Sequence, residues 1–227
     1  MKPDMVRAVA RRLVQVAIQF LVTFLPLLVL SGQFGWVWAW VYFGLYVAIV
    51  TVNMFVLPVE LIAERGRARE NVKNWDKTIT TISIVLTLGL FVVAGLDQRL
   101  GWSPELPLWL HLMGLAVMSM GQGLFSWAMA SNKFFSTRVR IQIDRGHIVA
   151  TGGPYRYVRH PGYVGYIATT LAIPLLLGSL WGLIPAAVTA CLFVVRTALE
   201  DRTLQEELDG YKDYAQHVPY RLLPRVW

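Results

Sequence analysis

The chain has 227 residues, of which 56% are hydrophobic and only 15% are charged, and its formal net charge is +7. Soluble domains contain about 25% charged residues, so this composition excludes an ordinary soluble protein, and its high hydrophobicity excludes intrinsic disorder. The single cysteine, Cys191, lies in an apolar run and excludes a secreted disulfide scaffold.

Four stretches without Asp, Glu, Lys or Arg define the predicted membrane spans. They are residues 13–59, 78–96, 106–132 and 160–195. Because a helix needs roughly 20 apolar residues to cross a bilayer, the first stretch predicts two spans that separate at residues 32–35. The second and third stretches predict one span each, and the fourth predicts two shorter helices that turn at residues 178–182. We therefore expect an all-α polytopic membrane protein with about six transmembrane helices.

Lysine and arginine are distributed unequally between the segments that join these spans. The counts are four in the amino-terminal tail, five in residues 60–77, one in 97–105, six in 133–159 and five in 196–227. With six alternating spans, 20 of the 21 basic residues fall on one side, and Arg99 is the exception. Cytoplasmic segments are enriched in Lys and Arg, so both termini and both long loops are expected to face the cytoplasm. Anionic lipid headgroups then account for the net charge, and no nucleic acid partner is predicted.

The connecting segments differ in their predicted structure. Residues 60–77 mix charges of both signs and are typical of a solvated connector. In residues 138–149, apolar and polar residues alternate around an Asp-Arg-Gly turn, which favours a short hairpin or extended pair at the membrane surface. Residues 200–218 are charged but carry apolar residues at helical spacing, which predicts one amphipathic helix lying on the membrane.

Residues 151–166, TGGPYRYVRHPGYVGY, concentrate groups that can bind a ligand. The proline after His160 favours a helix start, where unpaired N–H groups attract anions. Arg159 and His160 lie next to this helix start, and the small Gly162 and Gly165 would leave room there for a carboxylate or phosphate. Four tyrosines offer faces that stack on a base or attract a sulfonium, namely Tyr155, Tyr157, Tyr163 and Tyr166. The alternative interpretation is an aromatic and basic belt at the membrane boundary.

A second candidate pair is Arg196 and Glu200, which lie four residues apart on one helical face at the end of the sixth span. Glu200 would accept hydrogen bonds from a ligand, and Arg196 would hold a carboxylate. The alternative is a simple intrahelical ion pair. The four histidines show no metal-ligand spacing, so no metal site is predicted, and no Gly-x-Gly-x-x-Gly motif indicates a dinucleotide domain.

Three motifs in chain order resemble the isoprenylcysteine carboxyl methyltransferase family and its relatives among phospholipid methyltransferases. They are GPYRYVRHPGYVGY, R-x-x-x-E-D-x-x-L and GYKDYAQHVPYRLLP. The resemblance covers roughly residues 130–227 and implies an S-adenosylmethionine-dependent methyltransferase embedded in the membrane. It divides the chain into membrane-spanning helices one to four, residues 1–130, and a cofactor-binding catalytic region, residues 131–227.

The resemblance also implies roles for single residues. The loop before the Arg-His-Pro motif and the carboxyl-terminal helix would roof a cytosolic cofactor pocket. The implied cofactor-binding residues are His147, Ile148, Val149, Ala150, Tyr155, His160, Pro161, Gly162, Tyr163 and Glu200. Arg196 matches a family arginine on the substrate side, so Arg196 and Glu200 are the implied catalytic residues. Asp201 departs from the family, which has a second glutamate there, and Arg140 and Gln142 stand where relatives have a glutamine.

The chemistry of methyl transfer suits this setting. Transfer from a sulfonium to an anion cancels charge, so a dry pocket that holds both reactants in line accelerates it without a general base. A carboxylate or thiolate acceptor needs no proton removed, whereas an amine would require His160 or Glu200 as base. A lipophilic acceptor would arrive from the bilayer and the cofactor from the cytoplasm. A thiol, a fatty or isoprenoid acid and an aminophospholipid all remain open as acceptors.

Two other functions compete with methyl transfer. Sterol reductases, which use NADPH, look similar over the Arg-His-Pro and terminal tyrosine motifs. This chain is shorter, with fewer spans, and it lacks an added basic cluster for a 2′-phosphate. A non-enzymatic scaffold or transporter is the third possibility. The absence of ionisable residues from the span interiors argues against it, because transport pathways usually place such residues there.

Overall fold

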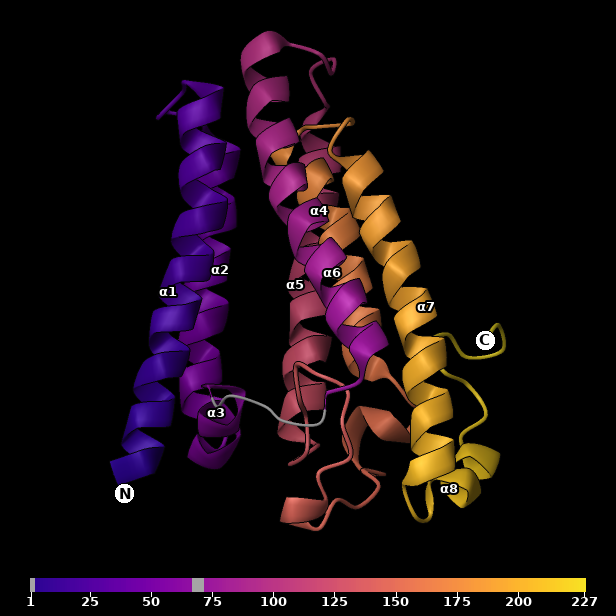
Figure 1. Cartoon of the computed structure of the whole chain (residues 1–227). Coiled ribbons are helices and arrows are strands. Elements are labelled where there is room, and N and C mark those ends of the chain that lie inside the picture. The colour runs from indigo at the N-terminus through magenta and orange to yellow at the C-terminus, as the bar shows by residue number, and fades with distance from the viewer. Residues whose placement is uncertain (1–2, 67–71) are drawn as a thin grey trace.

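A computed structural model describes residues 3–66 and 72–227, and within these residues every regular element is a helix (Figure 1). The α-helices are α1 (Pro3–Ser31), α2 (Val37–Val56), α3 (Val59–Gly66), α4 (Asn74–Leu100), α5 (Leu108–Ala130), α6 (Pro161–Leu177), α7 (Leu183–Glu207) and α8 (Tyr211–His217). Two short 3-10 helices, η1 (Ile143–Arg145) and η2 (Gly153–Arg156), lie between α5 and α6. The all-α prediction is confirmed.

A helix occupies each of the six predicted spans. Five of them, α1, α2, α4, α5 and α7, are long and apolar enough to cross a membrane. The sixth, α6, is equally apolar but has 17 residues, at the short end of the usual range. It ends where Gly178 adopts a left-handed conformation with φ of 80°, so the chain reverses into α7 within the predicted turn. The chain is therefore a multi-pass membrane protein.

Helices α5 and α6 approach each other closely through small residues. A Cβ atom added to Gly121 on α5 would lie 2.8 Å from the carbonyl oxygen of Gly165 on α6, and one added to Gly114 would lie 2.5 Å from the nitrogen of Leu176. Such contacts let two helix backbones pack without intervening side chains. The expectation that Gly165 leaves room for a ligand is therefore wrong, because the space beside it is filled by α5.

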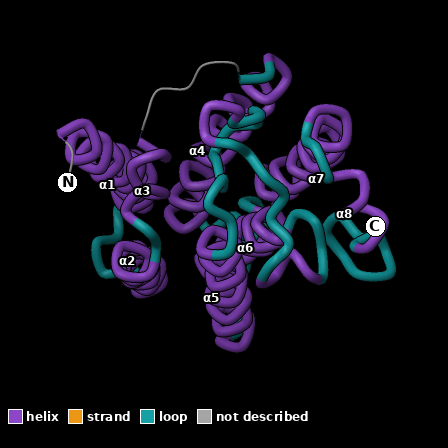
Figure 2. Tube along the Cα trace, turned by 90° about the horizontal axis from the view of Figure 1, so that it is seen from below, coloured by secondary structure: helices purple, strands orange, loops and turns teal. Residues whose placement is uncertain are grey.

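Helices α4 and α7 pack beside this pair, α1 packs on α4, and α3 packs on α1 (Figure 1). Large buried side chains join α1, α4 and α6 in one core, among them Leu27, Phe91 and Leu176. The amino terminus, α3, α8 and the loops between α5 and α6 all lie at one end of the bundle. Viewed from that end, these loops cross the bundle between α4 and α8 (Figure 2). The segments predicted to share one side of the membrane are thus at one end of the molecule.

Two connectors differ from their predicted structure. Residues 59–66 form α3, which buries Leu61 and Ile62 against the rest of the protein and is more than a solvated connector. Residues 67–71 of the same prediction lie outside the described residues. The predicted hairpin in 138–149 is also wrong, because η1 and the left-handed Gly146 form a tight turn and no strand is present in 72–227. The alternation does not follow burial either, because Val139 and the polar Gln142 are buried whereas Ile143 is 82% exposed.

The predicted single helix over residues 200–218 is broken in two. Helix α7 continues to Glu207, then Leu208 is extended and Gly210 takes φ of 79° before α8 begins. A left-handed glycine turns the chain at no steric cost. The break lets Leu208, Tyr211 and Tyr214 bury together against Tyr155. The apolar face of this segment therefore packs on the protein itself.

Candidate functional site

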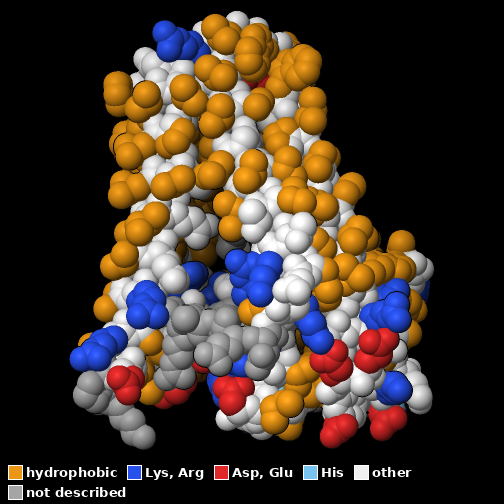
Figure 3. Space-filling view, viewed as in Figure 1, with side chains coloured by type: hydrophobic (Ala, Val, Ile, Leu, Met, Phe, Trp, Pro, Cys, Tyr) orange, Lys and Arg blue, Asp and Glu red, His pale blue; other side chains and the backbone are white. Residues whose placement is uncertain are grey.

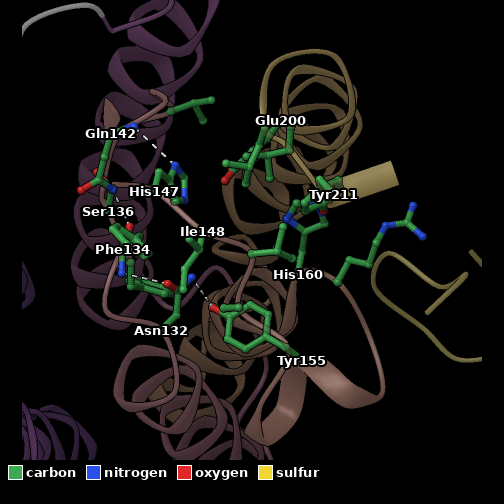
Figure 4. A pocket seen from close by; sticks show the side chains of 18 of the residues that line it. Asn132, Phe134, Ser136, Gln142, His147, Ile148, Tyr155, His160, Glu200 and Tyr211 are labelled. Carbon is green, nitrogen blue, oxygen red and sulfur yellow. Dashed lines mark hydrogen bonds between the residues drawn. The ribbon is translucent and has the colours of Figure 1, made fainter. Parts of the chain in front are cut away.

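A pocket opens at the end of the bundle where these loops lie. One wall comes from residues 132–150, the other from the end of α7 and from α8, and the start of α6 lies between them (Figure 4). The first wall includes Gln142, His147 and Ile148, and the second includes Glu200 and Tyr211. Three chain segments far apart in sequence thus enclose a single space.

The loop wall is held in shape by hydrogen bonds around Gln142. Its buried side-chain amide donates to the carbonyl oxygen of Phe134 at 2.6 Å, and its backbone N–H donates to Nδ1 of His147 at 3.3 Å. Burial, with the charges of Arg140 and Arg145, lowers the pKa of His147 to about 4. His147 is therefore neutral at physiological pH, and because Nδ1 is an acceptor, Nε2 carries the proton and is a donor.

The opposite wall is organised by Asp201 on α7, whose side chain is fully buried. Arg159 donates to both carboxylate oxygens at 2.7 and 2.9 Å, and Arg221 donates at 2.9 Å. Tyr211 donates at 3.1 Å, and Nε2 of His160 lies 3.3 Å away. Arg159, which was expected to help bind an external anion, lines the pocket and pairs with Asp201.

Glu200 and Arg196 point to different partners. The hydroxyl of Tyr163 donates to the carboxylate of Glu200. Arg196 pairs with Asp76 at the start of α4 at 2.7 Å, donates to the carbonyl oxygen of Thr137 at 3.0 Å, and lies 5.2 Å from the centre of the Tyr163 ring. Arg196 and Glu200 therefore do not form the simple intrahelical ion pair that was the alternative interpretation. Arg196 lies behind Tyr163 and is not among the residues that line the pocket.

The tyrosines divide into two groups. Tyr155 and Tyr163 line the pocket as predicted. Tyr157 is 64% exposed, and Tyr166 stacks on Phe193 at 4.0 Å, so neither lines it. Two others that sequence reasoning missed, Tyr211 and Tyr214, complete the lining. Burial raises the pKa of Tyr155, Tyr211 and Tyr214, so these phenols stay protonated.

Nine of the ten residues predicted to contact a cofactor line this one pocket, and Pro161 is the exception because it is buried in the first turn of α6. Sequence reasoning gave no role to residues 132–136, yet Asn132, Phe134 and Ser136 also line it. Asn132 donates to the Tyr155 hydroxyl at 3.3 Å. The sequence of this segment did not indicate that it lines a pocket, because its composition is that of an ordinary helix end at a membrane interface.

These features define a class of protein: a polytopic helical membrane protein with a pocket between residues 132–150 and the end of α7 with α8. Residues 112–206 match the isoprenylcysteine carboxyl methyltransferase (ICMT) family. Over these residues the chain is similar to this family. The matched residues include all of α6 and nearly all of α7, with His160 directly before α6 and with Arg196 and Glu200 on α7.

Individual relatives extend the match. A protein-S-isoprenylcysteine O-methyltransferase of Schizosaccharomyces pombe is 34% identical over 46% of this chain and 46% of its own length. The protein of that name in Mus musculus is 26% identical over 80% of this chain and 65% of its own length. An uncharacterized protein of Bacillus subtilis, YpbQ, is 30% identical over 66% of this chain and 94% of its own length. The chain thus spans between about half and two thirds of the eukaryotic relatives it matches.

Proposed function

We propose that this protein is a membrane-embedded methyltransferase that uses S-adenosylmethionine and methylates a lipophilic, isoprenylcysteine-like acceptor at a carboxylate. Similarity to the family supports the reaction class. The observation that carries the proposal is the single pocket lined by nine of the ten residues that the family motifs assign to the cofactor. Residues 131–227 would then be the catalytic region and residues 1–130 mainly its membrane scaffold.

The lining suits the chemistry of the proposed methyl donor. Glu200 supplies a negative charge, with the hydroxyl of Tyr163 donating to it, and this carboxylate favours a sulfonium and an ammonium group. His147 offers one N–H donor, and Ile148 and Val149 offer apolar surface for a purine. Bound there, S-adenosylmethionine would supply an electrophilic methyl group on its sulfonium.

The acceptor side is assigned to Arg196. Asp76 and the carbonyl of Thr137 fix its guanidinium against the ring of Tyr163, so that Arg196 adjoins the cofactor pocket without filling it. A guanidinium in this place would orient an acceptor carboxylate, whose oxygen forms the new bond to the methyl carbon as the carbon–sulfur bond breaks. A carboxylate acceptor releases no proton, so this assignment requires no general base. A thiolate would react in the same way.

The membrane orientation follows from the positive-inside rule. The pocket lies at the same end as the amino terminus, α3 and α8, where nearly all Lys and Arg are found. We place this end in the cytoplasm, where the water-soluble methyl donor is made available, while the acceptor arrives from the bilayer.

Ligand-dependent stability tests the proposal. Purified protein in detergent is expected to be stabilised by S-adenosylmethionine and by its demethylated product according to RT ln(1 + [L]/Kd), and not by NADPH. Stabilisation by NADPH instead would favour a sterol-reductase-like enzyme, and no shift with either would favour a non-enzymatic scaffold. Membranes with and without the protein are then supplied with radiolabelled methyl donor. The expected labelled product is a base-labile methyl ester. A labelled aminophospholipid would show instead that the acceptor group is an amine and not a carboxylate.

A further inference from the structure

Residues 219–227 follow α8 and lie at the edge of the bundle, beside α7 and on the side away from α1 and α2 (Figures 1 and 2). This segment ends nearer to the spans than α8 does. Past α7, the large hydrophobic side chains that are exposed are Leu223 and Val226, at 52% and 76%. The apolar residues of α8 pack on the protein, so the 219–227 segment is the part beyond α7 that presents apolar side chains outward.

The inner side of the 219–227 segment is fastened to the start of α6 and to α7. The backbone N–H of Arg159 donates to the carbonyl oxygen of Tyr220 at 2.9 Å, and that of His160 donates to the carbonyl oxygen of Arg221 at 3.0 Å. The guanidinium of Arg221 donates to Asp201 on α7 at 2.9 Å. Backbone and side-chain bonds together therefore fix where this segment lies.

These attachments place the segment just outside the apolar spans. His160 begins the uncharged run that ends at Val195 on α7. Asp201 lies six residues beyond Val195, which is about 9 Å along the helix axis. Segments that lie in a membrane interface bury their apolar side chains about 5–10 Å into the boundary between headgroups and acyl chains. The 219–227 segment is thus at the depth of the lipid headgroups.

The outer side of the segment has the composition of a membrane interface. The N–H of Val226 donates to the carbonyl oxygen of Leu223 at 3.1 Å, which brings these two exposed residues together across a turn. Within the turn Arg225 takes a φ of 65°, a conformation that glycine adopts at lower cost. The guanidinium of Arg221 lies 4.9 Å from the ring centre of Trp227. Tryptophan is enriched at the depth of the headgroups.

The surface on this flank changes character in the direction away from the spans. In the space-filling view, hydrophobic side chains continue from the bundle down to the level of this segment, with Lys and Arg beside them and Asp and Glu farther from the spans (Figure 3). Anionic headgroups attract basic residues at the membrane surface, so this order suits a protein surface that meets a bilayer.

We propose that residues 219–227 are an interfacial membrane anchor, which inserts Leu223, Val226 and Trp227 among the lipid headgroups at the pocket end and presents Arg225 to their phosphates. Because the same segment bonds to the backbone directly before α6, its insertion holds one side of the pocket in place. A bilayer suits this surface better than a second copy of the chain, since the surface continues the lipid-facing side of α7. The proposal does not depend on the proposed methyl transfer.

The depth of the anchor can be measured with spin labels, because the chain has a single cysteine. In a Cys191→Ser background, a nitroxide is attached at Val226→Cys. The reference positions are Val195→Cys on the exposed side of α7 and Ile143→Cys on an exposed loop that does not line the pocket. Each labelled protein is placed in nanodiscs of phosphatidylglycerol and phosphatidylcholine. Collisions of the label with oxygen and with a water-soluble nickel complex are then compared.

The oxygen-to-nickel collision ratio at position 226 is expected to be at least about threefold above that at 143 and closer to that at 195, because oxygen concentrates in the bilayer and the nickel complex in water. A ratio equal to that at 143 overturns the proposal. Low access to both reagents, with magnetic coupling between labels, would show that a second copy covers the segment and would overturn it as well.

The link to the pocket is tested by Leu223→Ser with Val226→Ser, and Ile143→Ser is the control. Hydrogen exchange of the Arg159 and His160 amides in nanodiscs is expected to be about threefold faster in the double variant and unchanged in the control, because those amides bond to the segment. Unchanged exchange in the double variant overturns the link. Melting temperatures check folding, and Val226→Ser alone serves if the double variant does not fold.

Discussion

Buried aspartates stand at both ends of the helical bundle, but they have different partners. At the end away from the pocket, Asp97 on α4 accepts from the backbone and hydroxyl of Ser103 and from the hydroxyl of Ser179. At the pocket end, Asp76 and Asp201 are paired with arginines. Hydrogen bonds to neutral partners fix the turn at a modest desolvation cost. An arginine–aspartate pair brings two charges out of water, and such pairs are retained where the orientation of a side chain matters. Asp97 is therefore a structural carboxylate, whereas Asp76 and Asp201 position side chains of the candidate site.

The largest expected effect is that of Asp201→Asn. It leaves the buried guanidinium of Arg159 without its counter-charge, which typically costs about 3–5 kcal/mol. We expect a large drop in melting temperature in detergent and loss of cofactor binding. Glu206→Gln, which removes an exposed acid from the same helix, is the control and should leave both unchanged. A stable Asp201→Asn protein that binds cofactor normally would show that Asp201 does not organise the pocket.

Asp76→Asn is expected to act on turnover. Arg196 would keep the carbonyl of Thr137 but lose its carboxylate, so its guanidinium is less firmly placed toward the acceptor. We expect kcat to fall about tenfold, near 1.4 kcal/mol, with cofactor affinity within twofold of wild type. Arg196→Ala should lower kcat further. Calorimetry and steady-state kinetics on the same preparation would contradict this assignment if cofactor affinity fell and kcat did not.

Glu200→Gln separates charge from hydrogen bonding. The amide still accepts from the Tyr163 hydroxyl but no longer neutralises a sulfonium. Affinity for S-adenosylmethionine is expected to fall about tenfold, equivalent to 1.4 kcal/mol, whereas affinity for the uncharged thioether product should fall less. His160→Ala is expected to weaken both ligands together. Calorimetry that finds equal losses for the two ligands in Glu200→Gln would argue against a sulfonium beside this carboxylate.

Asp97→Asn is expected to destabilise the protein less than Asp201→Asn does. Each hydrogen bond there has a neutral donor, and the amide can still accept one of them, so a loss of about 1–3 kcal/mol is expected. Cofactor affinity should stay at the wild-type value, because the pocket is at the other end. A melting curve and a cofactor titration measure the two effects separately, and a weakened affinity would show that the ends are coupled.

The smallest expected effect is the pH response of His147. Its pKa is about 4 in the folded protein against about 6.5 when unfolded, so between these values the unfolded chain binds more protons. Stability should therefore fall as the pH drops from about 6.5 to about 4, and His147→Gln should flatten that part of the curve. Melting temperatures measured across this range in both proteins provide the test. An identical slope in the variant would assign the response to other groups.

Much of the site could be predicted because its residues are close in sequence. The Arg-His-Pro motif predicts a helix start at Pro161, and the loop before it contains His147 to Ala150. All of these residues lie within a stretch of 15. Tyr211 and Tyr214 were missed because they reach the pocket only through the break at Gly210. The predicted hairpin was wrong because the alternating residues do not share one buried face, since Ile143 is exposed and the polar Gln142 is buried.

The sequence by itself determined the six spans and the end of the bundle at which cations gather. Those properties depend on local composition, because an uncharged run of sufficient length is stable in a bilayer only as a helix. Only the tertiary structure decided which charges pair. Asp76 and Arg196 are 120 residues apart, and Arg159 and Asp201 are 42 apart. Their pairing depends on how α4, α6 and α7 pack, and a buried charge takes the partner that packing brings to it.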